Sequence, residues 1–311
     1  MHRIWAIPEV ATTVLRLLEW PDQAHMARVC RGLWEMAIPL IWEEIYDISV
    51  FTAFLGTTKD DSEGLDIFTD HSSVAPHGGE PVHDRLAFHA RFVRTMEFTL
   101  DSKACQVVQL LSNTPSFNES LVKLKSLDIA ADLRKDTIDG TILFRTFQTH
   151  IMTRIRISVN SVSPEIPAEP LRSFVQAIAT SHLPVLQSFY IESVGSSSID
   201  PFYLEEVLRA HQRLQEVEII TADCTPETLE ILKNLPVLRD LRLRFWHYPA
   251  ERSLPMSPTD GYGFRHLVRL DIRCDLKTIK QVLGSIESDQ MEAFKMSDAR
   301  GPLTIQGVEG S

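Results

Sequence analysis

The sequence predicts an α/β fold, in which an N-terminal three-helix module precedes a curved solenoid of parallel strands with helices on its convex side. The main observation is a pattern with apolar residues at offsets zero, three and five, as in Leu238-Arg239-Asp240-Leu241-Arg242-Leu243. The pattern occurs eight times, with starts 24 to 34 residues apart. Such a period is typical of arrays in which each unit holds one strand and one helix. Proline-led helix starts between the copies are the second observation.

The first 46 residues predict three short helices. Pro8 suits the first turn of a helix, where its missing N–H is not needed. A second helix is expected to start at Pro21 and a third near Arg31. Pro39 is expected to kink or break the third helix, because proline cannot donate the backbone hydrogen bond of a helix interior.

Proline, cysteine and tryptophan follow one another in this segment in a distinctive order. They stand in Ile7-Pro8-Glu9-Val10, Leu17-Leu18-x-x-Pro21-Asp22, Ala27-Arg28-Val29-Cys30-Arg31, Trp34 and Leu40-Ile41-Trp42. In this order the segment resembles an F-box, and most closely the F-box-like segments of fungal proteins in which irregular leucine-rich repeats follow. F-boxes dock on the Skp-type adaptor of cullin–RING ubiquitin ligases. The resemblance implies adaptor-facing and core positions at Ile7, Pro8, Leu17, Leu18, Val29, Cys30, Trp34 and Trp42.

The alternative interpretation of these helices is a cap for the array. Solenoids need capped ends, and in a cap the tryptophans would serve only as core residues. A cap has no need for an exposed apolar groove. The exposure of the apolar side chains therefore bears on the choice between the two interpretations.

Residues 56 to 85 predict a flexible insert. They are rich in Gly, Pro, Ser and acidic residues, and bury too little apolar surface to offset the entropy of ordering. His71, His77, His83 and His89 recur every six residues, a spacing that matches neither a helical nor a strand face. No Cys or paired carboxylate accompanies them, so we expect solvated histidines and no metal site.

Residues 86 to 300 predict an irregular array of stacked units. Within each strand, offsets three and five point to one face and offsets two, four and six to the other. Capping residues followed by proline open helices at Glu169-Pro170, Asp200-Pro201 and Thr225-Pro226. In period and layout the region resembles the leucine-rich-repeat family. The eight units start at Val93, Leu124, Met152, Leu186, Leu214, Leu238, Leu267 and Met291.

Residues 245 to 263 interrupt the array with aromatic, proline and glycine residues. This interruption is a candidate recognition loop, because exposed aromatic side chains often anchor interfaces. Phe245 and Trp246 are better explained as filling the end of the stack. Tyr248 and Tyr262 remain candidates for partner contact.

The concave strand positions carry charge in blocks. If the strands stack in order, an acidic stripe lies beside a basic one, and the face suits a protein partner of mixed charge. The alternative is a solvated face with cross-strand ion pairs. The candidate substrate contacts on this face and in the loop are Tyr190, Glu216, Glu218, Arg242, Arg244, Arg269, Arg273, Tyr248 and Tyr262.

The totals restrict the class of protein. A net charge of −11 argues against a general nucleic-acid binder, which needs basic patches. No apolar run reaches the roughly 18 residues of a transmembrane helix, and we expect no secretory signal. The four cysteines are scattered without a C-x-x-C pair, which indicates reduced thiols in a cytoplasmic or nuclear protein.

No motif of an active site occurs in the sequence. It contains no G-x-S-x-G, no G-x-x-x-x-G-K-S/T, no G-x-G-x-x-G and no H-E-x-x-H. His182, His211, His247 and His266 stand near unit boundaries and are better explained as core or surface residues. We therefore expect no enzyme, and no cofactor or metal.

These observations predict four regions: an F-box-like helical domain at 1–55, the insert at 56–85, the repeats at 86–300 and a Gly-rich tail at 301–311 that frays. The resemblance implies a substrate-recognition adaptor of an SCF-type ubiquitin ligase, with the Skp-type adaptor, cullin subunits and a protein substrate as partners. The alternative is a protein-interaction scaffold whose N-terminal helices are only a cap. No nucleic-acid or membrane partner is expected.

Overall fold

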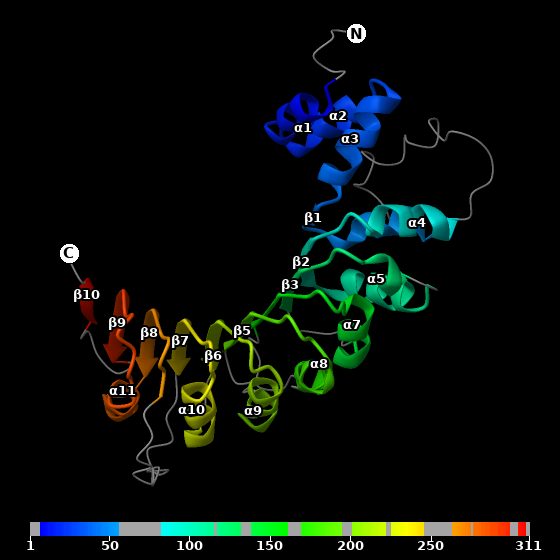
Figure 1. Cartoon of the computed structure of the whole chain (residues 1–311). Coiled ribbons are helices and arrows are strands. Elements are labelled where there is room, and N and C mark those ends of the chain that lie inside the picture. Colours follow the sequence, from blue (N-terminus) through cyan, green and yellow to red (C-terminus); the bar gives the residue numbers. More distant parts are fainter. Residues whose placement is uncertain are drawn as a thin grey trace.

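Among the described residues, nine parallel strands alternate with helices in one open, curved sheet, and the sequence predicts eight of these strands (Figure 1). The strands line the inner side of the curve, and the helices between them lie along its outer side. Leucine-rich-repeat solenoids have this layout. The structure is a computed structural model, and it describes residues 7–55, 82–114, 117–131, 138–160, 169–194, 201–221, 225–245, 263–274, 276–298 and 304–308.

Three helices form the N-terminal module, and Figure 1 places them at one end of the curved row. They are α1 (Pro8–Arg16), α2 (Trp20–Ala27) and α3 (Arg31–Ile41). Pro8 occupies the first turn of α1, as expected. Pro39 lies inside α3, and the helix continues to Ile41 instead of breaking. The proline removes one backbone bond near the end of α3, but the N–H of Trp42 still donates to the carbonyl of Ile38 at 3.1 Å.

The strands follow one another in the sheet in sequence order, which confirms the predicted stacking. The first nine are parallel, and the tenth pairs antiparallel with the ninth. Their bounds are β1 (Glu44–Ile45), β2 (Thr95–Leu100), β3 (Ser126–Ala131), β4 (Arg154–Asn160), β5 (Ser188–Val194), β6 (Glu216–Thr221), β7 (Asp240–Phe245), β8 (Arg269–Cys274), β9 (Ala293–Asp298) and β10 (Thr304–Val308). The last of these lies in the tail that the sequence analysis expects to fray.

The remaining helices cover the convex side of the sheet (Figure 1). They are the 3₁₀ helix η2 (Ile48–Phe54), α4 (Val82–Ala90), α5 (Ser102–Ser112), α6 (Phe117–Ser120), α7 (Gly140–Phe147), α8 (Glu169–Thr180), α9 (Pro201–Ala210), α10 (Pro226–Lys233) and α11 (Leu276–Leu283). Local capping fixes where several begin. The Asp101 side chain accepts from the backbone N–H of Ala104 at 2.7 Å, and Thr225 caps Thr228 in the same way at 3.0 Å.

The apolar pattern of each unit forms continuous rows across the sheet. At the centre of the array Val217 pairs with Leu241, and Leu241 pairs with Leu270. Seven of the eight offset-zero residues are at most 1% exposed: Val93, Leu124, Met152, Leu186, Leu214, Leu238 and Leu267. Burying a side chain of this size stabilises a fold by about 1.5–3 kcal/mol. The array is therefore held together by apolar rows that no single unit could bury.

A hydrogen-bond motif repeats between the units beside these rows. The carbonyl of Gln187, just before β5, accepts from the N–H groups of Gln215 and Glu216 at 2.8 and 3.0 Å. The carbonyl of Glu43, which lies directly before β1, accepts two N–H groups from the next unit in the same way. The segment that follows α3 is thus the first unit of the array that takes part in this motif.

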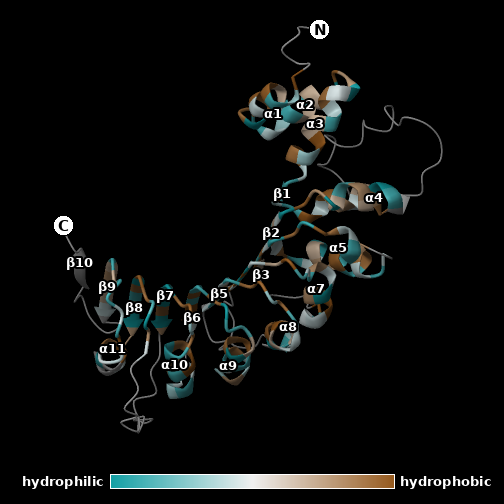
Figure 2. Cartoon of the chain, in the orientation of Figure 1, coloured by the Kyte–Doolittle hydropathy of each residue, from teal (hydrophilic) through white to brown (hydrophobic). Residues whose placement is uncertain are grey.

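One hydrophobic core extends from Leu15 in α1 to Met296 in β9. Figure 2 shows the hydrophobic sides of α9 and α10 turned toward the strands and their hydrophilic sides turned outward. Leu208 in α9 and Leu232 in α10 are fully buried in this way. The module and the array therefore share a core, while the inner strand face remains outside it.

Candidate functional site

The three helices of the module close on small and apolar residues. Ala11 and Leu15 of α1 are fully buried, as is Ala37 of α3. Gln23 stabilises the turn between α1 and α2, because its side-chain amide donates to the carbonyls of Leu15 and Leu18 at 3.0 and 3.1 Å. The end of α1 is thus held in place although its last side chains face solvent.

Apolar side chains are unusually exposed on this module. Leu17 is 82% exposed, Val29 63% and Ile7 49%, and all three stand at the ends of α1 and α2. In the described part of the chain, five of the twelve large exposed apolar side chains lie between residues 7 and 34. Exposed apolar residues that gather in one region mark sites of protein contact.

The structure divides the predicted adaptor-facing and core positions into exposed and buried ones. Ile7, Pro8, Leu17 and Val29 are exposed, and Leu18 and Cys30 are partly buried. Trp34 is 37% exposed, and its ring stacks on Phe88 of α4 at 5.6 Å between centroids. Trp42 is 5% exposed, so it is a core residue.

The junction between module and array is an aromatic cluster. The ring of Trp42 lies 5.9 Å from Phe51, 5.6 Å from Phe54 and 4.6 Å from His89, measured between centroids. Aromatic pairs at such distances add about 0.5–1.5 kcal/mol each beyond the area that they bury. The junction is therefore a packed joint.

A second set of contacts outside the core extends this joint. The Arg91 guanidinium lies 4.2 Å from the ring centroid of Phe88 and 4.7 Å from that of Phe92. Sequence reasoning did not single out these residues. The run Ala87-Phe88-His89-Ala90-Arg91-Phe92 is the signal that could have done so, since it concentrates three ring side chains next to an arginine.

The inner strand face holds the charged residues that the sequence analysis placed there, in the expected register. Glu218 of β6 pairs in register with Arg242 of β7, and their side chains form an ion pair at 3.3 Å. Cross-strand ion pairs, the alternative interpretation, therefore occur on this face. The others are Arg154–Glu216 at 3.2 Å, Arg156–Asp128 at 3.6 Å, Arg244–Asp271 at 3.4 Å and Arg269–Asp240 at 3.5 Å.

Tyr190 occupies the centre of the face. The guanidinium of Arg156 lies 4.2 Å from the centroid of its ring, and its hydroxyl donates to the Glu192 carboxylate. Burial, followed by this hydrogen bond, raises the pKa of Tyr190 above its ordinary value. Burial likewise raises the pKa of Asp128, against the opposing effect of Arg156. The centre of the face is thus a semi-buried polar cluster whose members hold one another in place.

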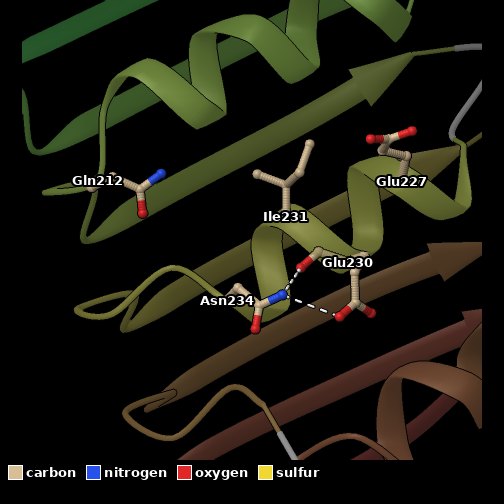
Figure 3. A pocket seen from close by; sticks show the side chains of 5 residues that line it. All are labelled: Gln212, Glu227, Glu230, Ile231 and Asn234. Carbon is tan, nitrogen blue, oxygen red and sulfur yellow. Dashed lines mark hydrogen bonds between the residues drawn. The ribbon is translucent and has the colours of Figure 1, made fainter. Parts of the chain in front are cut away.

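Two open hollows lie on the helical side. One, of about 240 Å³, is lined by residues of α10 and by Gln212 (Figure 3). There Asn234 donates to the carbonyl and carboxylate of Glu230 at 2.8 and 3.1 Å. The other, of about 390 Å³, lies between α7 and α8. Of the five residues that line the first hollow, only Ile231 is apolar, whereas small-molecule sites are mostly apolar (Figure 3).

The remaining predictions concern the histidines, metal or membrane binding, and the two inserted segments. Among the described residues, His211 is buried, and this burial lowers its pKa, while its Nε2 lies 3.1 Å from the carbonyl oxygen of Ile178. No group of three or more metal-ligating side chains occurs in the described stretches, and none of the helices in them could span a bilayer. Residues 56–81 and 246–262, with Tyr248 and Tyr262, lie outside the described residues.

A scan against models of known protein families and a search of curated proteins find no match to this chain. The repeat architecture suggests a protein-interaction scaffold, because curved arrays of this kind present an extended concave surface for binding.

Proposed function

We propose that this protein is a substrate-recognition subunit of an SCF-type cullin–RING ubiquitin ligase. The module would dock on the Skp-type adaptor, and the inner strand face would hold a protein substrate. The observation that supports this most is the exposure of apolar side chains on the module, with Leu17 82% exposed. A cap would turn such side chains toward the array, because exposing them to water costs free energy without a partner.

The mechanism is proximity. The packed joint around Trp42 would limit how far a substrate on the inner face moves relative to the adaptor. Fixing two reactants in one complex raises their effective concentration, and lysines of the substrate would meet the ubiquitin-carrying enzyme more often.

The test is co-purification of the tagged full chain with the adaptor. We expect Pro8→Ala combined with Leu17→Glu to lower adaptor recovery at least about tenfold, since losing an interface anchor costs about 2 kcal/mol or more. Leu17 is preferable to Trp34, because the Trp34 ring also stacks on Phe88 and its loss would loosen the joint.

The matched control is Val122→Glu, which places the same charge at an apolar residue that is 53% exposed but lies outside the module. This variant should recover as much adaptor as the parent chain. Undiminished recovery with the double variant would contradict the docking proposal.

A repeat-based interaction scaffold is the second candidate. The observation in its favour is that Glu43 and β1, directly after α3, form the first hydrogen-bonded unit of the array. The helices that precede this unit therefore lie where a cap would lie. Under this alternative the parent chain would bind proteins through its inner face, and neither adaptor nor cullin subunits would co-purify with it.

A further inference from the structure

The inner face changes sign along the array. On β7, β8 and β9 the inward-facing positions carry five cations, Arg242, Arg244, Arg269, Arg273 and Lys295, against two carboxylates, Asp240 and Asp271. We call the five cations the basic patch. On β2 to β6 the same positions carry five carboxylates and two arginines. The two halves therefore have formal charges of +3 (5 − 2) and −3 (2 − 5), in a chain whose net charge is −11.

Two arginines of the patch stand directly side by side. The register places Arg244 of β7 opposite Arg273 of β8. Their neighbours in the same row are Ile220 on β6 and Ser297 on β9, and the nearest carboxylate of the row, Glu192 on β5, lies two strands from Arg244. Like charges that face each other across strands destabilise a sheet. The ion pair between Arg244 and Asp271 offsets part of this repulsion, and a bound anion would offset more of it.

The ion pairs within the patch are loose. The distances are 3.3 Å for Arg242–Glu218, 3.4 Å for Arg244–Asp271 and 3.5 Å for Arg269–Asp240. Tight arginine–carboxylate bonds measure about 2.7–2.9 Å, and exposed pairs contribute only about 0–1 kcal/mol. The side chains of Arg242 and Arg269 are 56% and 62% exposed, and each can donate hydrogen bonds to a further carboxylate.

We infer that the basic patch binds an acidic segment of a partner protein, one in which several Asp and Glu residues follow one another in extended chain. The cations are distributed over three strands that lie about 4.8 Å apart. Such a spread matches several single charges along a peptide better than one compact dianion. The acidic half of the face repels a polyanion that runs on beyond β7, which limits the segment to a short one and excludes a long nucleic acid.

The inference rests on the proposed function in that the partner would be the substrate, but binding itself requires no adaptor. The probe is a fluorescent peptide in which Asp and Glu alternate with Ser, titrated with the purified full chain and followed by anisotropy. Three companion probes are the Asn/Gln version, a version with one phosphoserine and no Asp or Glu, and single-stranded RNA. We expect the acidic peptide to bind best, and to lose affinity as the ionic strength rises from about 0.05 M to about 0.3 M.

Two variants each remove two arginines from the inner face. Arg242→Gln with Arg273→Gln changes the basic patch, and Arg154→Gln with Arg156→Gln changes the acidic half. The first should weaken binding of the acidic peptide at least about tenfold, and the second less than about twofold. Equal losses in both variants, or tighter binding of the phosphoserine peptide or RNA by the parent chain, would overturn the inference.

Adaptor co-purification, measured on the same variants, separates this inference from the proposed function. Peptide binding without adaptor recovery would uphold the acidic partner and refute the ligase role. Adaptor recovery by a parent chain that does not bind the acidic peptide would refute the acidic partner alone.

Discussion

Gly263 lies just before β8, between the helical side of the array and the strand. Its N–H donates to the carbonyl of Ser285 at 3.0 Å, and its own carbonyl accepts from the N–H of Glu287 at 3.1 Å. The next residue, Phe264, is buried and adopts a left-handed backbone with φ of 52°. A bulky residue in this region is strained, and such strain persists only where the surroundings enforce it. The bonds of Gly263 supply that enforcement.

We expect Gly263→Ala to destabilise the fold. An added Cβ would lie 1.8 Å from Cγ of Lys233, whose stem is buried under the glycine. The bonded backbone cannot retreat, so either the lysine or the turn must move, at a cost of about 1–3 kcal/mol. The measurement is the midpoint of urea-induced unfolding.

Gly32→Ala is the matched control for this substitution. Gly32 lies in α3 with no atom within 4 Å of an added Cβ. Alanine should stabilise this helix by up to about 1 kcal/mol. If both variants unfolded at the midpoint of the parent chain, the fit between Gly263 and Lys233 would not be tight.

At the scale of elements, a buried polar cluster joins α9 and α10. Glu205 of α9 is 6% exposed and accepts hydrogen bonds from the hydroxyls of Thr225 and Thr228, the latter at 3.0 Å. The guanidinium of Arg209 lies 3.5 Å from the same carboxylate group. Because Thr225 also caps α10, this carboxylate fixes the start of one helix against the side of another.

Replacing Glu205 with Ala should therefore lower the free energy of unfolding by about 2–3 kcal/mol, since it leaves the buried hydroxyl of Thr228 and the partly buried one of Thr225 without their shared acceptor. Urea unfolding measures the loss. Glu206→Ala, on the same helix, should change stability by less than about 0.5 kcal/mol. Similar losses in both variants would mean that the cluster contributes nothing beyond an ordinary surface carboxylate.

The elements differ in how far the sequence could predict them. Strands β2 to β9 each bury one face, so apolar and polar residues alternate along them and the sequence shows this alternation. The apolar residues of all eight units stand in register across the sheet. β1 has only two residues, Glu44 and Ile45, which is too short to show any alternation. Its place comes from pairing with β2, a tertiary contact.

The candidate sites show the same division. Alternation alone assigns Glu218 and Arg242 to the inner face, but their ion pair depends on the register of two strands. Likewise, helical spacing marks Trp34 and Trp42 as apolar positions without separating them. Only the packing of η2 and α4 shows that Trp42 is enclosed while Trp34 keeps an exposed edge.

At the scale of the whole molecule, the boundary between the N-terminal module and the array falls inside a continuous core. Ile45, Ile48 and Phe51 follow the three helices in sequence, but each is buried in the core that the array shares. The ring of Phe51 contacts that of Phe117 edge-on at 5.4 Å. The elements that follow the three helices, β1 and η2, pack on β2, α4 and α5 of the array.

Two truncations should therefore differ sharply in stability. A chain that begins at residue 42 loses the module but keeps Trp42, β1 and η2, and we expect it to unfold cooperatively near the temperature of the full chain. A chain that begins at residue 56 also loses Ile45, Ile48 and Phe51. Their burial is worth roughly 5–9 kcal/mol in total, which lowers the melting temperature by about 10 °C or more.

Differential scanning calorimetry of the two truncated chains measures this difference directly. If the first truncation already melted as low as the second, the helices would be indispensable to the array, as a cap is. Equal and high melting temperatures would instead mean that the array stays folded without the pairing of β1 with β2 and the packing of η2. We expect a large difference between the two melting temperatures if the three helices are a separate module and β1 and η2 cover the end of the array. The burial that stabilises the array then lies after residue 42.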